Sequence, residues 1–398
     1  MRVPERQMGR SEVALLTGGG DRPYALGLAG SLIDAGVAFD FIGSDFLESD
    51  DLRLSPLVRF LNLRGDASPE AALFTKALRV ARYYARLMRY AATAEPRIFH
   101  ILWNNKLESF DRTLLLLYYR LLGKRIVHTV HNVNAAQRDG HDNAFNRLTL
   151  RIQYHLVHHL FVHTESMKRQ LQDEFGVPAK RISVIPFGIN STVPVTALTG
   201  PEARTRIGLG PSAQCILFFG NIAPYKGLSF LVEALAIVLR KLPNCCLVIA
   251  GRPKGSEAYW EEVRSRIAVL GLGDRVIERI EYVPDEETEI YFKAADVLAL
   301  PYAHVFQSGV LFLGYNFGLP AIASDIASFR EDVVEGESGF VCAPRDAPAL
   351  AAAVERYFGS DLYRCLAQRR ESIRQYACQK YSWSSVAAIT LGVYRRAV

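Results

Sequence analysis

The feature that most constrains the fold is a run of short apolar segments between Phe218 and Pro344. Each segment ends in a turn containing glycine or proline, and most of these turns lead into a helical stretch. The segments read FFGNIAPYKGLSFLVEA, LVIAGRPKG, AADVLALPY and FQSGVLFLGYNFGLPAIASD. This alternation is typical of a parallel α/β sheet. Ligands of such sheets bind beyond the carboxyl ends of the strands, where helix N-termini and bare backbone amides can hold phosphate.

The length and composition place the chain among two-domain globular proteins. Its 398 residues fit two domains of about 150–200 residues each. A hydrophobic content of 49% and a net charge of +6 do not call for a nucleic-acid partner. The six cysteines lack the spacing of metal ligands, and most lie in apolar segments, which predicts buried thiols in a reducing cytoplasm. With no signal peptide or membrane-length apolar run visible, we expect a cytoplasmic protein, either free or peripheral on the inner face of a membrane.

Both halves of the chain show the same scheme. The first opens with VALLTGGG at residues 13–20, a strand whose glycine turn leaves the backbone open to a ligand. FHILW, KRIVHTVHNV and HLFVHTES are predicted as further strands, and residues 191–200 as a linker. In the second half, CILFFG, CCLVIAG, RVIERIEYV, VLALPY, LPAIASD and SGFVCAP predict a second doubly wound sheet. The last segment is predicted to be an amphipathic helix.

Taken in order, these motifs resemble the retaining nucleotide-sugar glycosyltransferases of the GT-B fold, in the large family 4 group. The resemblance rests on the glycine turn, HTVHN, HTES, VIPFGIN, G-x-x-x-P-Y-K-G, AAD…LPY and G-x-P-x-I-A-S. It implies two Rossmann-like domains facing a cleft, an acceptor-side domain at 1–195 and a nucleotide-sugar-binding domain at 196–382. It also implies a crossover helix at 383–398 that packs on the first domain. The implied activity is hexose transfer, with retention, from a UDP- or GDP-sugar to a glycan or lipid-linked acceptor, as in surface polysaccharide or glycolipid assembly.

Three positions depart from the family pattern. Asn221 stands where an arginine is common, and Val305 and Leu313 stand where two glutamates eight residues apart are usual. The contacts of those glutamates with ribose and donor sugar are therefore not carried over. Their loss leaves a second interpretation open, that of a catalytically weak sugar-nucleotide or glycan-binding homologue. A dinucleotide-binding function is not supported, because TGGGDRPYALG does not match G-x-G-x-x-G in register.

Retention by same-face attack needs no protein nucleophile, so the protein has to stabilise the leaving diphosphate and position the sugars. Lys226 is the catalytic candidate for the first task, although an ordinary surface lysine is the alternative. Arg252 is likewise either a phosphate ligand or a solvated loop arginine. The candidates for binding donor and phosphate are Gly18, Gly19, Gly20, Asn221, Tyr225, Gly227, Arg252, Ser308, Gly309 and Val310. Because Lys226 and helix N-termini supply positive charge, we expect no metal cofactor.

His131, at the end of the HTVHN strand, resembles the cleft histidine of the family and is the second catalytic candidate, with Asn132 on the acceptor side. A structural histidine at a strand end is the alternative. His128 is expected in the core. A further group of four histidines spans a helix–strand transition without a nearby carboxylate, so metal binding is not expected. These are His155, His158, His159 and His163.

Residues 74–90 are predicted to form a basic amphipathic helix, in which basic residues recur every three or four positions. They are Lys76, Arg79, Arg82, Arg86 and Arg89. Such a helix can lie on an anionic bilayer, at about 1 kcal/mol per basic residue. It can equally expose a solvated face while its apolar side packs on the first sheet. A lipid-linked acceptor would favour the membrane interpretation.

Overall fold

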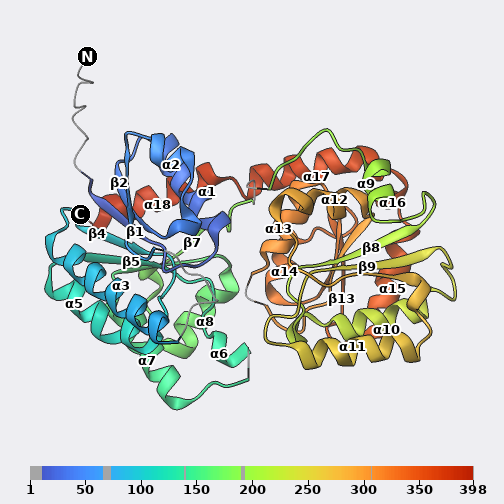
Figure 1. Cartoon of the computed structure of the whole chain (residues 1–398), viewed down its shortest axis with the longest axis horizontal. Coiled ribbons are helices and arrows are strands. Elements are labelled where there is room, and N and C mark those ends of the chain that lie inside the picture. The colour runs from blue at the N-terminus through green and yellow to red at the C-terminus, as the bar shows by residue number, and fades with distance from the viewer. Residues whose placement is uncertain (1–10, 66–72, 139, 190–192, 306, 398) are drawn as a thin grey trace. The chain divides into compact units, whose positions relative to one another are not determined.

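The computed structural model describes residues 11–65, 73–138, 140–189, 193–305 and 307–397. The chain divides into two compact units (Figure 1). The N-terminal unit comprises Met1–Gly188 and Trp383–Val398, and the C-terminal unit comprises Ile189–Ser382. Each unit is a parallel sheet covered by helices. No helix in the described ranges has both the length and the apolar character that a membrane crossing requires.

The N-terminal unit contains a seven-stranded parallel sheet with the strand order β3-β2-β1-β4-β5-β6-β7. The strands are β1 (Val13–Leu16), β2 (Phe39–Gly43), β3 (Val58–Asn62), β4 (Ile98–Ile101), β5 (Arg125–Thr129), β6 (His159–Val162) and β7 (Ile182–Val184). β1 lies between β2 and β4, with Val13 in register with both Phe39 and Ile98. The strand order reverses at β1, which is where ligands of doubly wound sheets bind.

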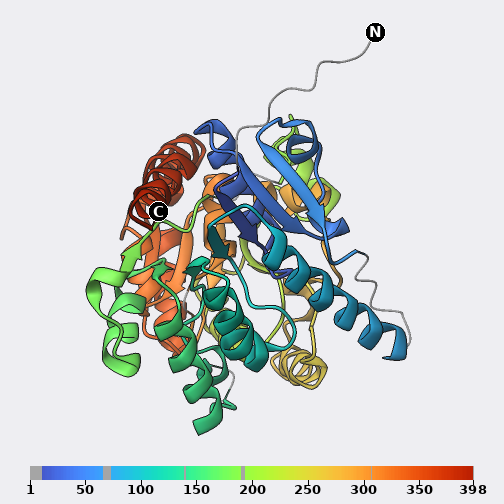
Figure 2. The same ribbon diagram turned by 90° about the vertical axis from the view of Figure 1, so that its left-hand side faces the viewer.

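Helices cover this sheet on both sides (Figures 1 and 2). Capping residues fix their ends: Thr164 accepts from the Met167 amide at the start of α8, and Gly176 ends that helix at φ +68°. The helical segments of this unit are α1 (Arg22–Asp34), η1 (Asp45–Leu47), α2 (Asp50–Leu54), α3 (Leu73–Thr93), α4 (Glu108–Phe110), η2 (Asp111–Leu115), α5 (Leu116–Leu121), α6 (Ala135–Arg138), α7 (Ala144–Leu156), α8 (Glu165–Phe175), η3 (Ala179–Arg181) and α18 (Trp383–Ala397).

The last helix, α18, returns to the N-terminal unit, as the GT-B resemblance implies. Val386, Val393 and Tyr394 are buried in the same core as α1 and the first strands. At the start of α18 the Trp383 ring packs on α1, where a Cβ added to Gly27 would lie 2.2 Å from it. Glycine is therefore required at position 27 for this contact.

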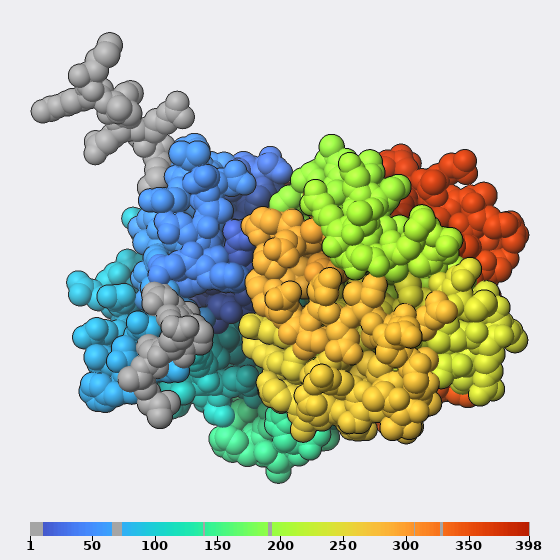
Figure 3. Space-filling view, turned by 45° about the vertical axis from the view of Figure 1, so that its right-hand side comes forward, coloured from blue at the N-terminus to red at the C-terminus, as the bar shows by residue number. Residues whose placement is uncertain are grey.

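The C-terminal unit contains a six-stranded parallel sheet in the order β10-β9-β8-β11-β12-β13, which confirms the second doubly wound sheet. The strands are β8 (Gln214–Phe219), β9 (Cys245–Ala250), β10 (Val276–Arg279), β11 (Val297–Leu300), β12 (Ala321–Ser324) and β13 (Gly339–Cys342). The helical segments are α9 (Gly200–Arg206), η4 (Pro224–Lys226), α10 (Leu228–Val238), α11 (Glu257–Val269), η5 (Gly273–Arg275), α12 (Asp285–Ala294), α13 (Gly309–Asn316), α14 (Ala327–Asp332), α15 (Ala347–Phe358), α16 (Asp361–Arg364) and α17 (Leu366–Lys380). In the space-filling view, light-green α9 lies against orange α12 (Figure 3).

Two further features of the C-terminal unit concern the burial of its cysteines and the attachment of the segment before α9. Cys215, Cys245, Cys246 and Cys342 are buried free thiols, whereas Cys365 and Cys378 are exposed. The segment before α9 is tied to α12, because both the amide and the hydroxyl of Thr196 donate to the Glu289 carboxylate.

Candidate functional site

The turn after β8 is shaped by close contacts between backbones. Gly220 and Gly227 have φ values of +92° and +67°, in the left-handed region that favours glycine. A Cβ on Gly227 would lie 2.0 Å from the Pro301 carbonyl oxygen, and one on Gly251 would lie 1.9 Å from the Gly220 carbonyl oxygen. The turn is therefore held against the ends of the neighbouring strands β9 and β11, and it fixes the position of Lys226.

The Lys226 side chain is buried, with 6% of the residue exposed. Its Nζ lies 3.2 Å from where a Cβ on Gly220 would stand and 5.4 Å from the centre of the Tyr302 ring. Within the described ranges no carboxylate or other hydrogen-bond acceptor pairs with this ammonium group. Burial lowers the pKa of Lys226, although the neighbouring Tyr225 opposes the shift. A buried cation without an anionic partner is unfavourable, so this position suits an anionic ligand.

Helix α13 begins beside this lysine. Ser308 is its N-cap residue, and the Ser308 hydroxyl is buried without a hydrogen-bond partner, as is that of Tyr302. These two hydroxyls face one another without a hydrogen bond of acceptable geometry. A Val310 methyl lies 3.6 Å from where a Cβ on Gly220 would stand, so the start of α13 meets the glycine turn. The structure thus brings Lys226, Ser308 and the first amides of α13, those of Gly309 and Val310, to one place.

The remaining predicted donor ligands of this unit lie around the same turn. Tyr225 accepts a hydrogen bond at its carbonyl from the Ala303 amide, and its ring centre lies 6.2 Å from that of Tyr302. Asn221 is exposed. Arg252 is also exposed, and its guanidinium lies over the Tyr282 ring at 5.3 Å. The structure therefore gives Arg252 an aromatic partner at the surface, while its role toward a ligand stays a prediction.

In the N-terminal unit, the glycine turn after β1 is packed under two side chains. An added Cβ on Gly19 would lie 1.5 Å from Arg64 Nη1, and one on Gly20 would lie 2.0 Å from the Trp103 ring. An added Cβ on Gly18 would lie 2.1 Å from the Trp103 carbonyl oxygen. These contacts alone require glycine at positions 18, 19 and 20. A phosphate-binding role for the three amides stays a prediction.

His131 lies directly above the carboxyl end of β5, inside an aromatic cluster. Its ring stacks parallel on Trp103, with centroids 4.0 Å apart, and meets the edge of Tyr24 at 4.7 Å. His131 Nδ1 lies 3.1 Å from His163 Nε2, while its own Nε2 is buried without a partner. Burial, reinforced by His163, holds the pKa of His131 well below its ordinary range. The imidazole is therefore neutral, and Asn132 beside it is exposed.

The other histidines have structural partners. His128 is buried as predicted, with Nδ1 3.0 Å from the Ile101 carbonyl oxygen. His155 faces the Arg151 carbonyl, His158 accepts from the Ile126 amide, and His159 pairs with Ser183. In the ranges that the structure describes, no group of three or more potential metal ligands occurs.

Four residues of these clusters were not singled out as site residues by the sequence analysis: Arg64, Trp103, His163 and Tyr302. Trp103 closes the FHILW segment and Tyr302 closes VLALPY, so each is the second residue after a buried strand. Large aromatic residues at the carboxyl ends of strands were the available signal. Arg64 carries no such signal, because only the fold brings it over Gly19.

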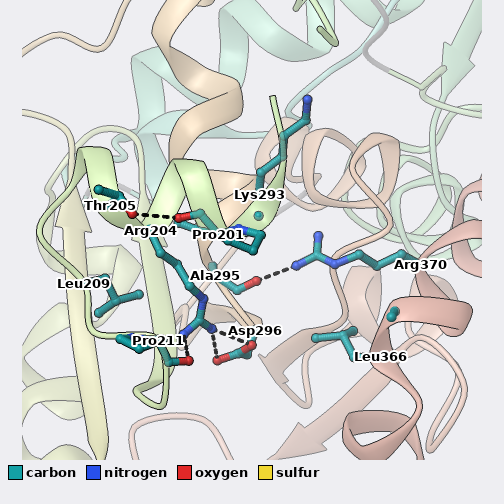
Figure 4. Close-up of a pocket in the computed structure, with 13 residues that line it drawn as sticks. Pro201, Arg204, Thr205, Leu209, Pro211, Lys293, Ala295, Asp296, Leu366 and Arg370 are labelled. Atoms are coloured by element: carbon teal, nitrogen blue, oxygen red, sulfur yellow. Dashed lines mark hydrogen bonds and ion pairs between the residues drawn. The ribbon is translucent and has the colours of Figure 1, made fainter. Parts of the chain in front are cut away.

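A separate cavity of about 430 Å³ lies at the opposite, amino-terminal edge of the C-terminal sheet, where Asp296 precedes β11 (Figure 4). Arg204 binds both oxygens of Asp296 at 2.8 Å. Arg370 donates to the Ala295 carbonyl and also to the carbonyls that end α12 and α13. Lys293 pairs with Glu289 at 2.6 Å. The three cations around this cavity thus have carboxylate or carbonyl partners within the protein, in contrast to the ammonium group of Lys226.

Comparison with known families decides the classification. A model of Glycosyltransferase Family 4 matches residues 18–193, and a model of Glycosyl transferases group 1 matches residues 213–360. Together the two models span most of both units. The chain is a GT-B glycosyltransferase of the family 4 type. These matches confirm the resemblance to family 4 that the sequence motifs show.

Curated relatives of this glycosyltransferase include the D-inositol 3-phosphate glycosyltransferases of Acidothermus cellulolyticus (31% identical over 69% of this chain and 63% of that protein) and of Kineococcus radiotolerans (28%, over 69% and 66%). Glycogen synthase of Mycobacterium tuberculosis is 29% identical over 68% of this chain and 62% of its own length. The glycosyltransferase thus matches less than two thirds of the length of these relatives.

Solved structures of the same fold match nearly the whole chain. The Anabaena protein HepE, in complex with UDP and glucose, is 17% identical, with a TM-score of 0.73 over 96% of this chain and 100% of its own. Sucrose-phosphate synthase from Thermosynechococcus elongatus is 20% identical, with a TM-score of 0.75 over 97% of this chain and 99% of its own. At these identities the likeness shows the GT-B fold.

Proposed function

We propose that this glycosyltransferase moves a hexose from a UDP- or GDP-sugar to a glycan or lipid-linked acceptor with retention of configuration. The observation that carries the proposal is the buried Lys226 ammonium, which has no anionic partner among the described residues and lies beside the start of α13. A diphosphate is the part of a nucleotide-sugar that such a position fits best, because it offers two negative charges to one ammonium group and several amides.

The catalytic role that we assign to Lys226 is to offset the charge on the departing diphosphate. Removing one such preorganised contact typically slows an enzyme by about 10²–10³, or about 3–4 kcal/mol. Ser308 adds a hydroxyl donor that is unused in the free protein, and Gly309 and Val310 add amides at the N-terminus of an eight-residue helix. Tyr225 and Gly227 hold the turn, and Asn221 and Arg252 lie at its exposed rim.

In the N-terminal unit, His131 is the residue that we assign to the sugar, and Asn132 the one that we assign to the acceptor side. Gly18, Gly19 and Gly20 are proposed to offer amides to the diphosphate. Support for a nucleotide-sugar donor comes from the Anabaena protein HepE, whose structure is in complex with UDP and glucose. The relatives named as D-inositol 3-phosphate glycosyltransferases and glycogen synthase support transfer of a sugar to a hydroxyl-rich acceptor.

We propose that no metal takes part. The positive charge that a divalent ion would bring to the diphosphate is available from Lys226 and from the helix dipole of α13. Groups of the chain itself then stabilise the departing diphosphate.

We propose that the enzyme is peripheral on the inner face of a membrane with an anionic surface. Helix α3 is the element that contacts this surface. Arg82, Arg86 and Arg89 are exposed on α3, while Tyr83 and Leu87 on its other side are buried. A basic outer face over an apolar inner face supports binding to acidic lipid head groups. It also fits a role in surface polysaccharide or glycolipid assembly, in which the acceptor is lipid-linked.

The alternative is a catalytically weak homologue that binds sugar nucleotides or glycans. Val305 and Leu313, in place of the usual glutamates, favour it, and Leu313 is buried, with 6% of the residue exposed. Assaying nucleoside diphosphate release from a panel of UDP- and GDP-hexoses, with and without membrane extract, separates the two. Acceptor-dependent release, with the anomeric configuration of the product read by NMR, supports the transferase. Binding of a donor without release under any condition supports the alternative.

A further inference from the structure

The two histidines of the aromatic cluster form a hydrogen bond that has a definite direction. His163 Nδ1 lies 3.3 Å from the Ile185 carbonyl oxygen, and His163 Nε2 lies 3.1 Å from His131 Nδ1. Burial lowers the pKa of His163 to about 4 and that of His131 well below its ordinary value, so both rings are neutral near pH 7. Each neutral ring carries one hydrogen, on one of its two nitrogens.

The Ile185 carbonyl determines where these hydrogens are. A carbonyl oxygen only accepts, so His163 Nδ1 carries the hydrogen and donates it to Ile185. His163 Nε2 then has a lone pair and accepts from His131 Nδ1. His131 is therefore the Nδ1–H tautomer, and its Nε2 carries a lone pair. That Nε2 is the buried atom without a partner.

We propose that His163 is a positioning residue that holds His131 in the Nδ1–H tautomer, so that Nε2 presents a lone pair to a hydroxyl of the bound sugar. Only the identity of the ligand rests on the proposed function. The tautomer is a property of the free protein.

The packing around the ring supports this assignment. Trp103 stacks on one face of His131 with an interplanar angle of 0°, and Tyr24 and Phe187 pack against it in T-shaped contacts. The Leu102 carbonyl also faces His131, and only a bond to it from Nε2 would require the opposite Nε2–H tautomer. No hydrogen bond of acceptable geometry joins Nε2 to that carbonyl, whereas the contact with His163 is one.

An unpartnered buried acceptor destabilises the free protein by about 1–3 kcal/mol. A hydroxyl that donates to Nε2 satisfies this atom, provided that the groups enclosing it shift on binding. A sugar hydroxyl is a donor of suitable size, because it is a single O–H group, and a hexose carries several of them. The Nδ1–H tautomer is the only neutral form of His131 that can accept it at Nε2.

Nitrogen-15 NMR of the full chain labelled at histidine tests the tautomer without any ligand, because an unprotonated ring nitrogen resonates far downfield of a protonated one. The His131 signals are assigned by their loss in His131→Gln. We expect a protonated Nδ1 and an unprotonated Nε2 in the wild type. In His163→Phe, which keeps a ring but removes the acceptor, His131 should move toward the Nε2–H form. In His163→Gln, whose side-chain carbonyl can accept from Nδ1–H, the wild-type pattern should return.

His155→Gln, on an exposed position of α7, is the matched control and should change nothing at His131. Thermal denaturation checks that each variant folds. A wild-type His131 that is protonated at Nε2, or one that keeps the Nδ1–H pattern in His163→Phe, overturns the proposal. A sugar nucleotide that the enzyme turns over should shift the Nε2 resonance, and UDP or GDP alone should not. An unchanged resonance with that donor overturns the role toward the sugar, while failure to turn over any donor contradicts only the proposed function.

Discussion

The ammonium group of Lys226 lies against Gly220, 3.2 Å from the point that a Cβ would occupy there. A side chain at position 220 would therefore meet the cation, and the bare backbone leaves Nζ beside the start of α13. Among the described residues this ammonium has no anionic partner, whereas the cations of the cavity at the other edge of the sheet are paired with carboxylates or carbonyls. The contrast marks the carboxyl edge as the place for a ligand.

Ser308→Ala should separate stability from binding. The Ser308 hydroxyl is buried and makes no hydrogen bond in the free protein, so removing it should leave the free energy of unfolding unchanged within about 1 kcal/mol or raise it. Affinity for a nucleoside diphosphate should fall about ten- to a hundredfold, which is the size of one hydrogen bond to a charged group. Denaturant unfolding and calorimetric titration measure the two quantities. Unchanged affinity in the folded variant would remove Ser308 from the site.

Chelation should leave activity intact. Because Lys226 and the α13 N-terminus supply the positive charge at the diphosphate, turnover in excess EDTA should equal turnover with Mg²⁺ or Mn²⁺. Initial rates of nucleoside diphosphate release, measured in both buffers, check this. Loss of turnover on chelation that added metal restores would show that the phosphate site had been assigned wrongly.

Replacing Arg82, Arg86 and Arg89 with glutamine should weaken binding to anionic vesicles by about 3 kcal/mol, at about 1 kcal/mol per residue. Binding of the wild type should also fall with salt, because exposed charges are screened over about 8–10 Å near physiological ionic strength. Co-sedimentation at two salt concentrations measures both effects. The control carries glutamine at Arg264 and Arg369, two exposed positions of the C-terminal unit. If the α3 variant and this control sediment alike, α3 is an ordinary solvated face.

Asp332 should make stability depend on pH. Burial raises the pKa of its carboxyl to about 6, although the Tyr381 hydroxyl and Lys380 oppose the shift. The folded state therefore binds a proton more tightly than the unfolded chain, and this group's contribution to stability falls as the pH rises from about 4 to about 6. Asp332→Asn should be more stable than the wild type at pH 7 by roughly 1–3 kcal/mol, with little gain at pH 4.

Denaturant unfolding of both proteins at pH 4, 5, 6 and 7 tests this difference. In the wild type the Gln307 side-chain amide donates to Asp332, and the Gln307 side-chain oxygen has no partner. In Asp332→Asn the Gln307 amide can flip, so that its oxygen accepts from the asparagine side chain. A stability difference that does not change with pH would show that the Asp332 carboxyl titrates normally in the folded protein.

Much of the fold follows from local patterns. Most strands of both sheets were predicted from short apolar runs, which parallel sheets buried on both faces require. The edge strand β3 was not predicted, because its segment VRFLN is only partly buried and lacks such a run. The turn around Lys226 was predicted for the same reason, since its glycines lie at positions that a strand-to-helix connection needs.

The parts of the candidate site that the sequence did not predict depend on contacts between distant segments. The hydrogen bond between His131 and His163 joins residues 32 positions apart. Arg64, which follows β3, reaches Gly19 because β3 and β1 belong to the same sheet. His163 was placed with three other histidines by its spacing, yet each of the four has its own partner in the fold. Sequence spacing carries no information on contacts of this kind, which arise from the order of strands in the sheet.

The central claim, that Lys226 binds and stabilises the diphosphate of the donor, is tested most directly by titrating UDP and GDP into the wild type and Lys226→Ala. Lys254→Ala, an exposed lysine of the same unit, is the control. We expect Lys226→Ala to keep its melting temperature, to bind the preferred nucleotide far more weakly and to turn over at least about a hundredfold more slowly. Lys254→Ala should match the wild type. Wild-type affinity and near-normal turnover in a folded Lys226→Ala variant would contradict the account.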